Sequence, residues 1–85
     1  MLISVVVVPD KGERINEPLV LKDGSTIRDA LTEAHRRGWW PGGVSKLWLN
    51  GTPKNEPLKD MREALKDGDE LQIQLPQTYD VWQID

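Results

Sequence analysis

The hydrophobic and polar positions near the start of the chain predict two strands. Residues Leu2–Val8 form an apolar run rich in β-branched side chains, which is too short for a helix and is typical of a central strand buried on both faces. A turn rich in Pro, Asp and Gly follows and leads into Ile15–Lys22. Because Pro18 cannot donate to a strand ladder, we predict this second strand at an edge, paired with the first as a hairpin. Its apolar face comprises Ile15, Leu19 and Leu21.

The pattern then changes to a helical period in the stretch "DGSTIRDALTEAHRRG", residues 23–38. Thr26 followed three residues later by Asp29 fits a capping box, with Asp in place of the usual Glu. Gly38 suits the left-handed residue that ends a helix. The apolar positions recur at three- and four-residue spacing and predict one buried stripe, formed by Ile27, Ala30, Leu31 and Ala34.

The second half of the chain predicts two more strands around an irregular segment. Residues 46–49 read as a short strand with two leucines on one face and Trp48 on the other, followed by an Asn-Gly turn. Two prolines in residues 52–60 predict irregular structure, and Met61–Leu65 is then expected to form one helical turn. After an Asp-Gly-Asp turn, Leu71–Leu75 alternates leucine and isoleucine with glutamine, which predicts a half-exposed strand.

The order of these elements predicts an α+β fold. It runs strand, strand, helix, strand, short helix, strand, or ββαβ(short helix)β, and favours a mixed sheet of four to five strands with one helix packed across it. We expect a single domain over residues 1–76 and an apolar C-terminal tail over residues 77–85.

This order, together with two motifs, resembles the β-grasp or ubiquitin-like superfamily. "DGSTIRDALTEA" after a hairpin and "LKDGDELQIQLP" before the tail are similar to the bacterial sulfur carriers, namely the small subunit of molybdopterin synthase and the thiamine sulfur carrier. The resemblance covers about residues 1–76 and implies the β-grasp fold. It implies less about function, because the fold hosts carriers, modifiers, adaptors and enzyme subunits alike.

The chain departs from the carriers at its end. The resemblance places their chemistry in a flexible C-terminal Gly-Gly, whereas this sequence ends Gln83-Ile84-Asp85. The Gly42-Gly43 pair precedes a predicted core strand, so cleavage there would destroy the domain. No residue therefore inherits the carriers' reactive terminus.

Composition and charge narrow the classes of function. The chain has 85 residues and a net charge of −3, which argues against a general binder of nucleic acid or anionic membranes. It has no cysteine, which excludes disulfides, zinc thiolates, iron–sulfur ligation and a thiol nucleophile. The apolar run at residues 2–8 is expected to be a strand rather than a signal peptide, and no apolar run approaches the roughly 20 residues of a membrane span. The expected location is the cytoplasm.

The polar residues predict no catalytic, metal or cofactor site. His35 has no partners for a catalytic or metal-binding role and reads as a solvated histidine at a helix end. Asp67 and Asp69 fit turn chemistry rather than a calcium loop, because the other oxygen ligands are missing. The expectation is a protein that is not an enzyme and needs no cofactor.

The aromatic residues suggest where a partner binds. The resemblance of "LWLNG" to the third strand of the ubiquitin-like family places Trp48 at a solvent-facing position, with Gln72 and Gln74 expected on the same face. Tryptophan is enriched at interface hot spots. The alternative is that the tail, or a neighbouring Arg14 or Lys46 side chain, covers it. The Trp39-Trp40 pair, beside two arginines, is favoured to close the core, with at most one exposed; a base-stacking platform is the other interpretation.

The tail is the second candidate for binding. Tyr79, Val81 and Trp82 make it too apolar for a solvating end, and it is expected to form an added edge strand on this domain or a partner, or to pack over Trp48. The favoured function is a non-catalytic ubiquitin-like module that docks a protein partner, as a monomer or in a hetero-complex. The alternatives are an accessory subunit of a larger assembly, such as an oxygenase complex or phage tail, and a sulfur carrier or protein modifier.

Overall fold

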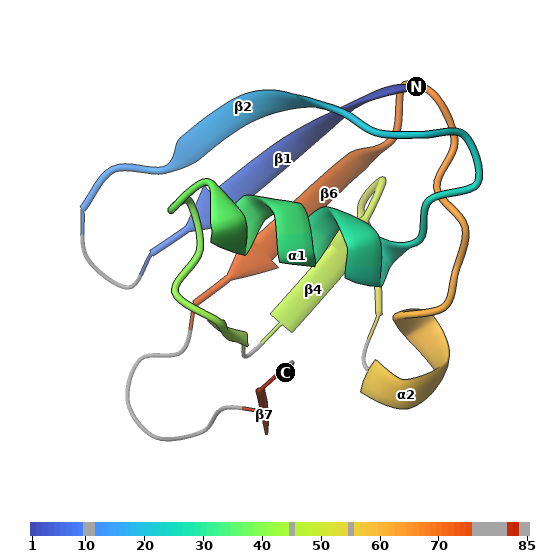
Figure 1. Cartoon of the computed structure of the whole chain (residues 1–85). Coiled ribbons are helices and arrows are strands. Elements are labelled where there is room, and N and C mark those ends of the chain that lie inside the picture. The colour runs from blue at the N-terminus through green and yellow to red at the C-terminus, as the bar shows by residue number, and fades with distance from the viewer. Residues whose placement is uncertain (10–11, 45, 55, 76–81, 84–85) are drawn as a thin grey trace.

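A computed structural model describes residues 1–9, 12–44, 46–54, 56–75 and 82–83 (Figure 1). Within these residues, a helix lies across one face of a five-stranded mixed sheet, as expected for the α+β class. The elements in chain order are β1 (Leu2–Val8), β2 (Ile15–Val20), α1 (Ile27–Arg36), β3 (Gly43–Val44), β4 (Lys46–Leu49), β5 (Thr52–Pro53), α2 (Pro57–Asp60), β6 (Glu70–Gln74) and β7 (Trp82–Gln83).

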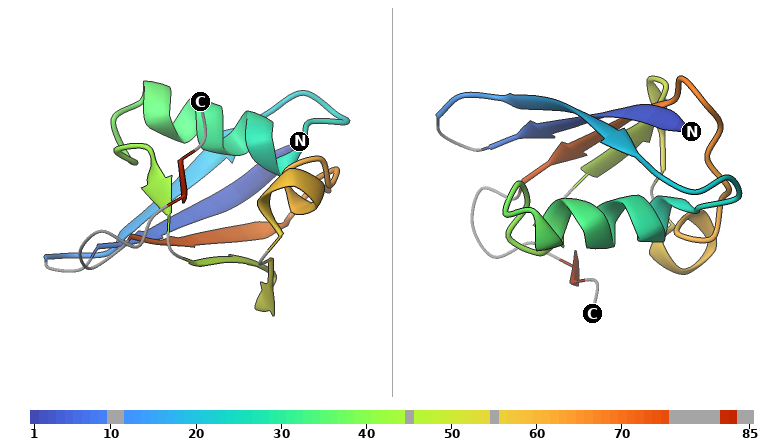
Figure 2. Two further views of the ribbon diagram at one scale, coloured as in Figure 1. Left: turned by 90° about the horizontal axis from the view of Figure 1, so that it is seen from below. Right: turned by 45° about the horizontal axis from the view of Figure 1, so that its top comes forward.

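The main sheet has the strand order β2-β1-β6-β4-β5. Strand β1 is antiparallel to β2 and parallel to β6, and the remaining pairs, β6–β4 and β4–β5, are antiparallel. The predictions that the first strand is central and the second lies at an edge are confirmed. Strands β3 and β7 form a separate antiparallel pair, which lies beside α1 on the helix side of the main sheet (Figure 2).

The first strand is buried on one face and only partly on the other. Ile3, Val5 and Val7 lie under α1 and are at most 1% exposed. On the opposite face Leu2 and Ser4 are exposed and Val6 is buried. The prediction of a strand buried on both faces is therefore wrong at Leu2 and Ser4, because α1 covers only one side of the sheet (Figure 2).

Helix α1 has the predicted ends and the predicted stripe. The Thr26 hydroxyl oxygen accepts from the Asp29 amide at 3.3 Å, and the Thr26 amide donates to the Asp29 carboxylate at 2.9 Å. Gly38 follows the helix with φ of +80°, a left-handed conformation that suits glycine. The four apolar residues of the stripe are fully buried: Ile27, Ala30, Leu31 and Ala34.

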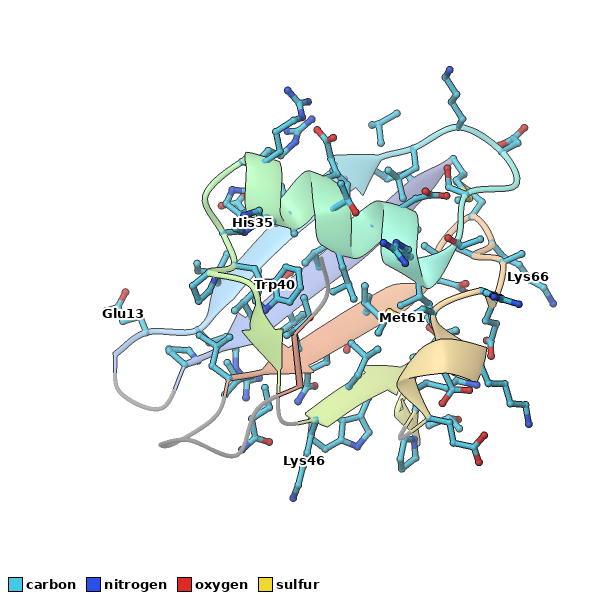
Figure 3. The ribbon with its side chains drawn as sticks, turned by 60° about the horizontal axis from the view of Figure 1, so that its bottom comes forward. Glu13, His35, Trp40, Lys46, Met61 and Lys66 are labelled. Carbon is cyan, nitrogen blue, oxygen red and sulfur yellow. The ribbon has the colours of Figure 1, made fainter. Side chains whose placement is uncertain are left out.

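The tryptophan pair after the helix closes one end of the core, as predicted. Trp40 is 2% exposed, and Trp39 is half-buried against the core (Figure 3). His35 differs from the expectation of a simply solvated side chain. The His35 side chain is exposed, but its Nδ1 lies 2.8 Å from the Trp40 carbonyl oxygen. Its ring meets the Trp40 ring edge-on, with the ring centres 5.9 Å apart. His35 therefore donates a hydrogen bond that holds the chain after α1 against the helix.

The proline-containing segment is more regular than predicted. Asn50 and Gly51 both have positive φ, as a tight hairpin turn requires, and β5 pairs with β4. Pro57 begins α2, where its missing N–H costs nothing because the first amides of a helix have no partner within it. The helical turn expected at Met61–Leu65 is therefore wrong, and α2 ends at Asp60 instead.

Among the described residues, no helix is long and apolar enough to cross a membrane.

Candidate functional site

The face of the main sheet opposite α1, which we call the outer face, carries three of the residues predicted to bind a partner. In strands, successive side chains point to opposite faces, and directly paired residues share a face. Its described members therefore follow from the strand register: Leu2, Ser4, Val6, Val8, Asn16, Pro18, Val20, Lys46, Trp48, Pro53, Glu70, Gln72 and Gln74.

Strand β4 places Trp48 on the outer face by burying its two neighbours. Leu47 is fully buried and Leu49 is 6% exposed, both within the core beneath α1. Trp48, between them, points to the opposite side and is half-buried. Its direct neighbours across the strands are Gln72 on β6 and Pro53 on β5.

These pairings form a central row across the outer face, which runs Asn16, Val6, Gln72, Trp48, Pro53. Val6, at 4% exposure, is buried although it lies opposite the helix, and its cross-strand neighbours are Asn16 and Gln72. Gln74 lies one pair along, next to Lys46, and is half-buried. The structure thus brings together three of the predicted residues: Trp48, Gln72 and Gln74.

Sequence reasoning missed an apolar pair at one corner of the outer face. Leu2 is 51% exposed and Val20 is 72% exposed, and they are direct partners between β1 and β2. The signal was present in the alternation, because each lies next to a residue with a buried side chain, Ile3 and Leu19. The mostly apolar run Leu2–Val8 favours burial on both faces, and this hides the alternation.

The described outer face is nearly uncharged. It carries one acidic residue, Glu70, and one basic residue, Lys46, whose side chain points away from α1 in Figure 3. The ion pairs between side chains lie instead near the two helices. Hydrogen bonds from Arg36, and then from Arg37, lower the pKa of Glu33 to about 2, and the bond from Lys54 to Glu63, at 2.7 Å, raises the pKa of Lys54.

A polar clamp fixes the register of the two strands that carry Trp48 and Gln72. The Asn50 amide side chain donates to the Asp69 carboxylate at 2.9 Å and accepts from the Glu70 backbone amide at 2.8 Å. Asp69 also accepts from the Lys66 amide, and Asp67 accepts from the Leu2 amide, each at 2.7 Å. The carboxylates of Asp67 and Asp69 therefore accept hydrogen bonds that stabilise the turn and the strands beside it. In the part of the chain that the structure describes, no three His, Asp or Glu side chains gather as a metal ion would require.

The tail residues do not join this group in the described structure. The backbone of Trp82 lies in β7, where it pairs with Val44 of β3. This small sheet is on the helix side, away from the outer face (Figure 2). The tail strand that contains Trp82 therefore pairs on this domain, as one alternative predicted, but it joins the small β3–β7 sheet and not an edge of the main sheet. Tyr79 and Val81 lie outside the described residues.

In comparisons with known proteins, no family model matches the chain, and no curated protein matches it. The function below is therefore inferred from the fold and from the outer face.

Proposed function

We propose that this chain is a non-catalytic interaction module of the β-grasp, or ubiquitin-like, type that docks a protein partner through the outer face around Trp48. The fold part of this proposal is supported by the sheet order β2-β1-β6-β4-β5, with a central parallel pair and a helix across one face. That arrangement is compatible with a β-grasp-like class. The sheet order is a second line of support for the β-grasp type, beside the order of the elements along the chain.

The observation that carries the binding part is the indole of Trp48 on β4, beside the edge strand β5, on a sheet face that no described helix or strand covers (Figure 2). Trp48 stands half-buried in the central row, so part of a large apolar side chain meets solvent. Tryptophan is enriched among the few residues that carry most of the binding energy of an interface once a partner desolvates them. The exposed Leu2–Val20 pair extends the apolar surface toward β2.

The pairing of β7 favours a docking module over a sulfur carrier. A carrier presents an extended terminal segment to the active site of another enzyme. Here Trp82–Gln83 pairs with Gly43–Val44 on the chain's own domain.

The test is capture of partners from a lysate of the source organism by the immobilised chain and by two variants. Trp48→Ala removes the indole on the outer face, whereas Trp39→Ala removes one that packs on the helix side and serves as the matched control. Circular dichroism first shows that both variants fold. A partner is assigned to the outer face when Trp48→Ala loses it and Trp39→Ala keeps it.

The affinity of the identified partner for each variant then measures how much Trp48 contributes to binding. Loss of a central tryptophan is expected to weaken binding roughly 30-fold, measured by calorimetry, while Trp39→Ala stays within about threefold. Equal capture by Trp48→Ala and the unaltered chain would contradict the proposal. Partners that survive a urea wash, or a changed intact mass of the bait, would indicate covalent carrier or modifier chemistry instead.

A further inference from the structure

Each edge of the described main sheet carries a proline. Strand β2, at one edge, contains Pro18, and β5, at the other, contains Pro53. An edge strand normally offers its unpaired amides and carbonyls to a further strand, which makes it a site of unwanted association. Whether a proline blocks this depends on which side of its strand the proline nitrogen faces.

The hydrogen bonds at the start of β1 determine this for Pro18. The Met1 amine donates to the Leu21 carbonyl at 2.7 Å, and the Leu21 amide donates to the Met1 carbonyl at 2.9 Å. These two residues therefore form a hydrogen-bonded pair, and such pairs alternate with non-bonded ones along an antiparallel ladder. Counting along the register makes Ser4–Pro18 a non-bonded pair. The Pro18 nitrogen therefore faces the free edge.

A bond on the far side of β1 agrees with this count. The Ser4 amide donates to the Asp69 carbonyl at 2.9 Å, so it faces away from β2. In a non-bonded pair, the backbone polar groups of both residues face away from each other's strand. Ser4 turned toward β6 thus implies Pro18 turned outward.

The same reasoning applies at the other edge. The Lys54 amide donates to the Leu47 carbonyl at 2.8 Å, which makes Leu47–Lys54 a hydrogen-bonded pair. The adjoining pair, Trp48–Pro53, is then non-bonded, and the Pro53 nitrogen faces away from β4. At both edges the proline occupies a position where an incoming strand would need an amide.

From these two registers we infer that Pro18 and Pro53 close the edges of the main sheet to a further strand, including β2 or β5 of a second copy of this chain. At each proline the incoming carbonyl finds a ring carbon instead of an N–H donor. On β2 the remaining outward amides, those of Asn16 and Val20, are separated by this gap.

The apolar pair beside β2 shows why this edge needs closing. Val20 and Leu2 are the large hydrophobic side chains that stand most exposed among the described residues, and Val20 lies two residues from Pro18. An edge with free donors next to such side chains is a template for self-association.

The test is the oligomeric state of Pro18→Val in the full chain, measured by sedimentation over a range of concentrations. The variant restores an outward amide with a good strand-forming residue, and it is expected to dimerise with at least about tenfold higher affinity than the unaltered chain. Hydrogen exchange should slow at the Asn16 and Val20 amides. The matched control is Glu17→Val, whose amide faces β1, and it is expected to leave the state unchanged.

Pro53→Thr repeats the test at β5, with Thr52→Val as its control. This second pair of variants gives the answer if Pro18→Val does not fold. Proline variants that associate no more than the unaltered chain would overturn the inference. Controls that associate as strongly would also overturn it, because added apolar surface would then be the cause. The measurement involves no partner, so its result is independent of the proposed function.

Discussion

Glu33 accepts hydrogen bonds from two guanidinium groups in the last turn of α1. Arg36 Nε lies 3.1 Å from Glu33 Oε2, and Arg37 Nε lies 3.0 Å from Oε1. Arg37 also lies over the Trp39 ring, 5.4 Å from its centre. These contacts bind the helix end to the chain that leads into Trp40, and the single Glu33 carboxylate offsets one of the two positive charges beside the tryptophan pair.

The same contacts make a prediction about pH. The hydrogen bond from Arg36, and then that from Arg37, lower the pKa of Glu33 from 4.5 to about 2 in the folded chain. A carboxyl with a depressed folded-state pKa contributes stability above its unfolded pKa, and this contribution is lost as pH falls from about 4.5 toward 2. Arg36→Gln should raise the Glu33 pKa toward its ordinary value more than Arg37→Gln does, measured by NMR titration of the carboxyl carbon. Equal titration midpoints for Glu33 in the unaltered chain and both variants would contradict this cause of the lowered pKa.

At the scale of the elements, the sequence predicted those whose signals are local. The capping box and the apolar stripe predicted α1, and β1, β2, β4 and β6 followed from β-branched runs or alternation. The elements in segment 52–60 do not follow from the sequence, because its two prolines favour irregular structure. In the structure one proline suits an outward edge position and the other the start of a helix.

The candidate site divides in the same way. Alternation alone predicted that Trp48 points away from the core. The exposure of the Leu2–Val20 pair depends on which strands become neighbours and which face the helix covers. Both are set by long-range contacts, which the local pattern does not reveal.

The cap of α1 gives a prediction for one element. Thr26→Ala removes the hydroxyl that accepts from the Asp29 amide, and replacing such a cap typically costs about 1 kcal/mol of folding free energy. Thr32→Ala is the matched control, because Thr32 is exposed in the middle of the same helix, where alanine is favoured by a few tenths of a kcal/mol. Urea denaturation should show a lower midpoint for Thr26→Ala alone, with an unchanged slope. Equal losses in both variants would mean that the cap is not what stabilises the helix end.

At the scale of the whole molecule, the described structure has two chemically different sides. The helix side carries the guanidinium–carboxylate cluster, the tryptophan pair and the β3–β7 sheet. The outer face carries Trp48 among uncharged neighbours. Because the sheet separates them, a change on one side is expected to leave the other side's environment unaltered.

Removal of residues 76–85 tests this separation. The truncated chain loses β7, whose pairing is with β3, so it should still unfold cooperatively. In the amide NMR spectrum, signals of Gly43 and Val44 should shift, while those of Val6 and Gln72 and the indole signal of Trp48 should stay in place. Trp48→Ala is the complementary variant, since it should shift Gln72 and leave Gly43 unmoved. A Trp48 indole signal that moves on truncation would show that the tail reaches the outer face, and a partner would then have to displace it before docking.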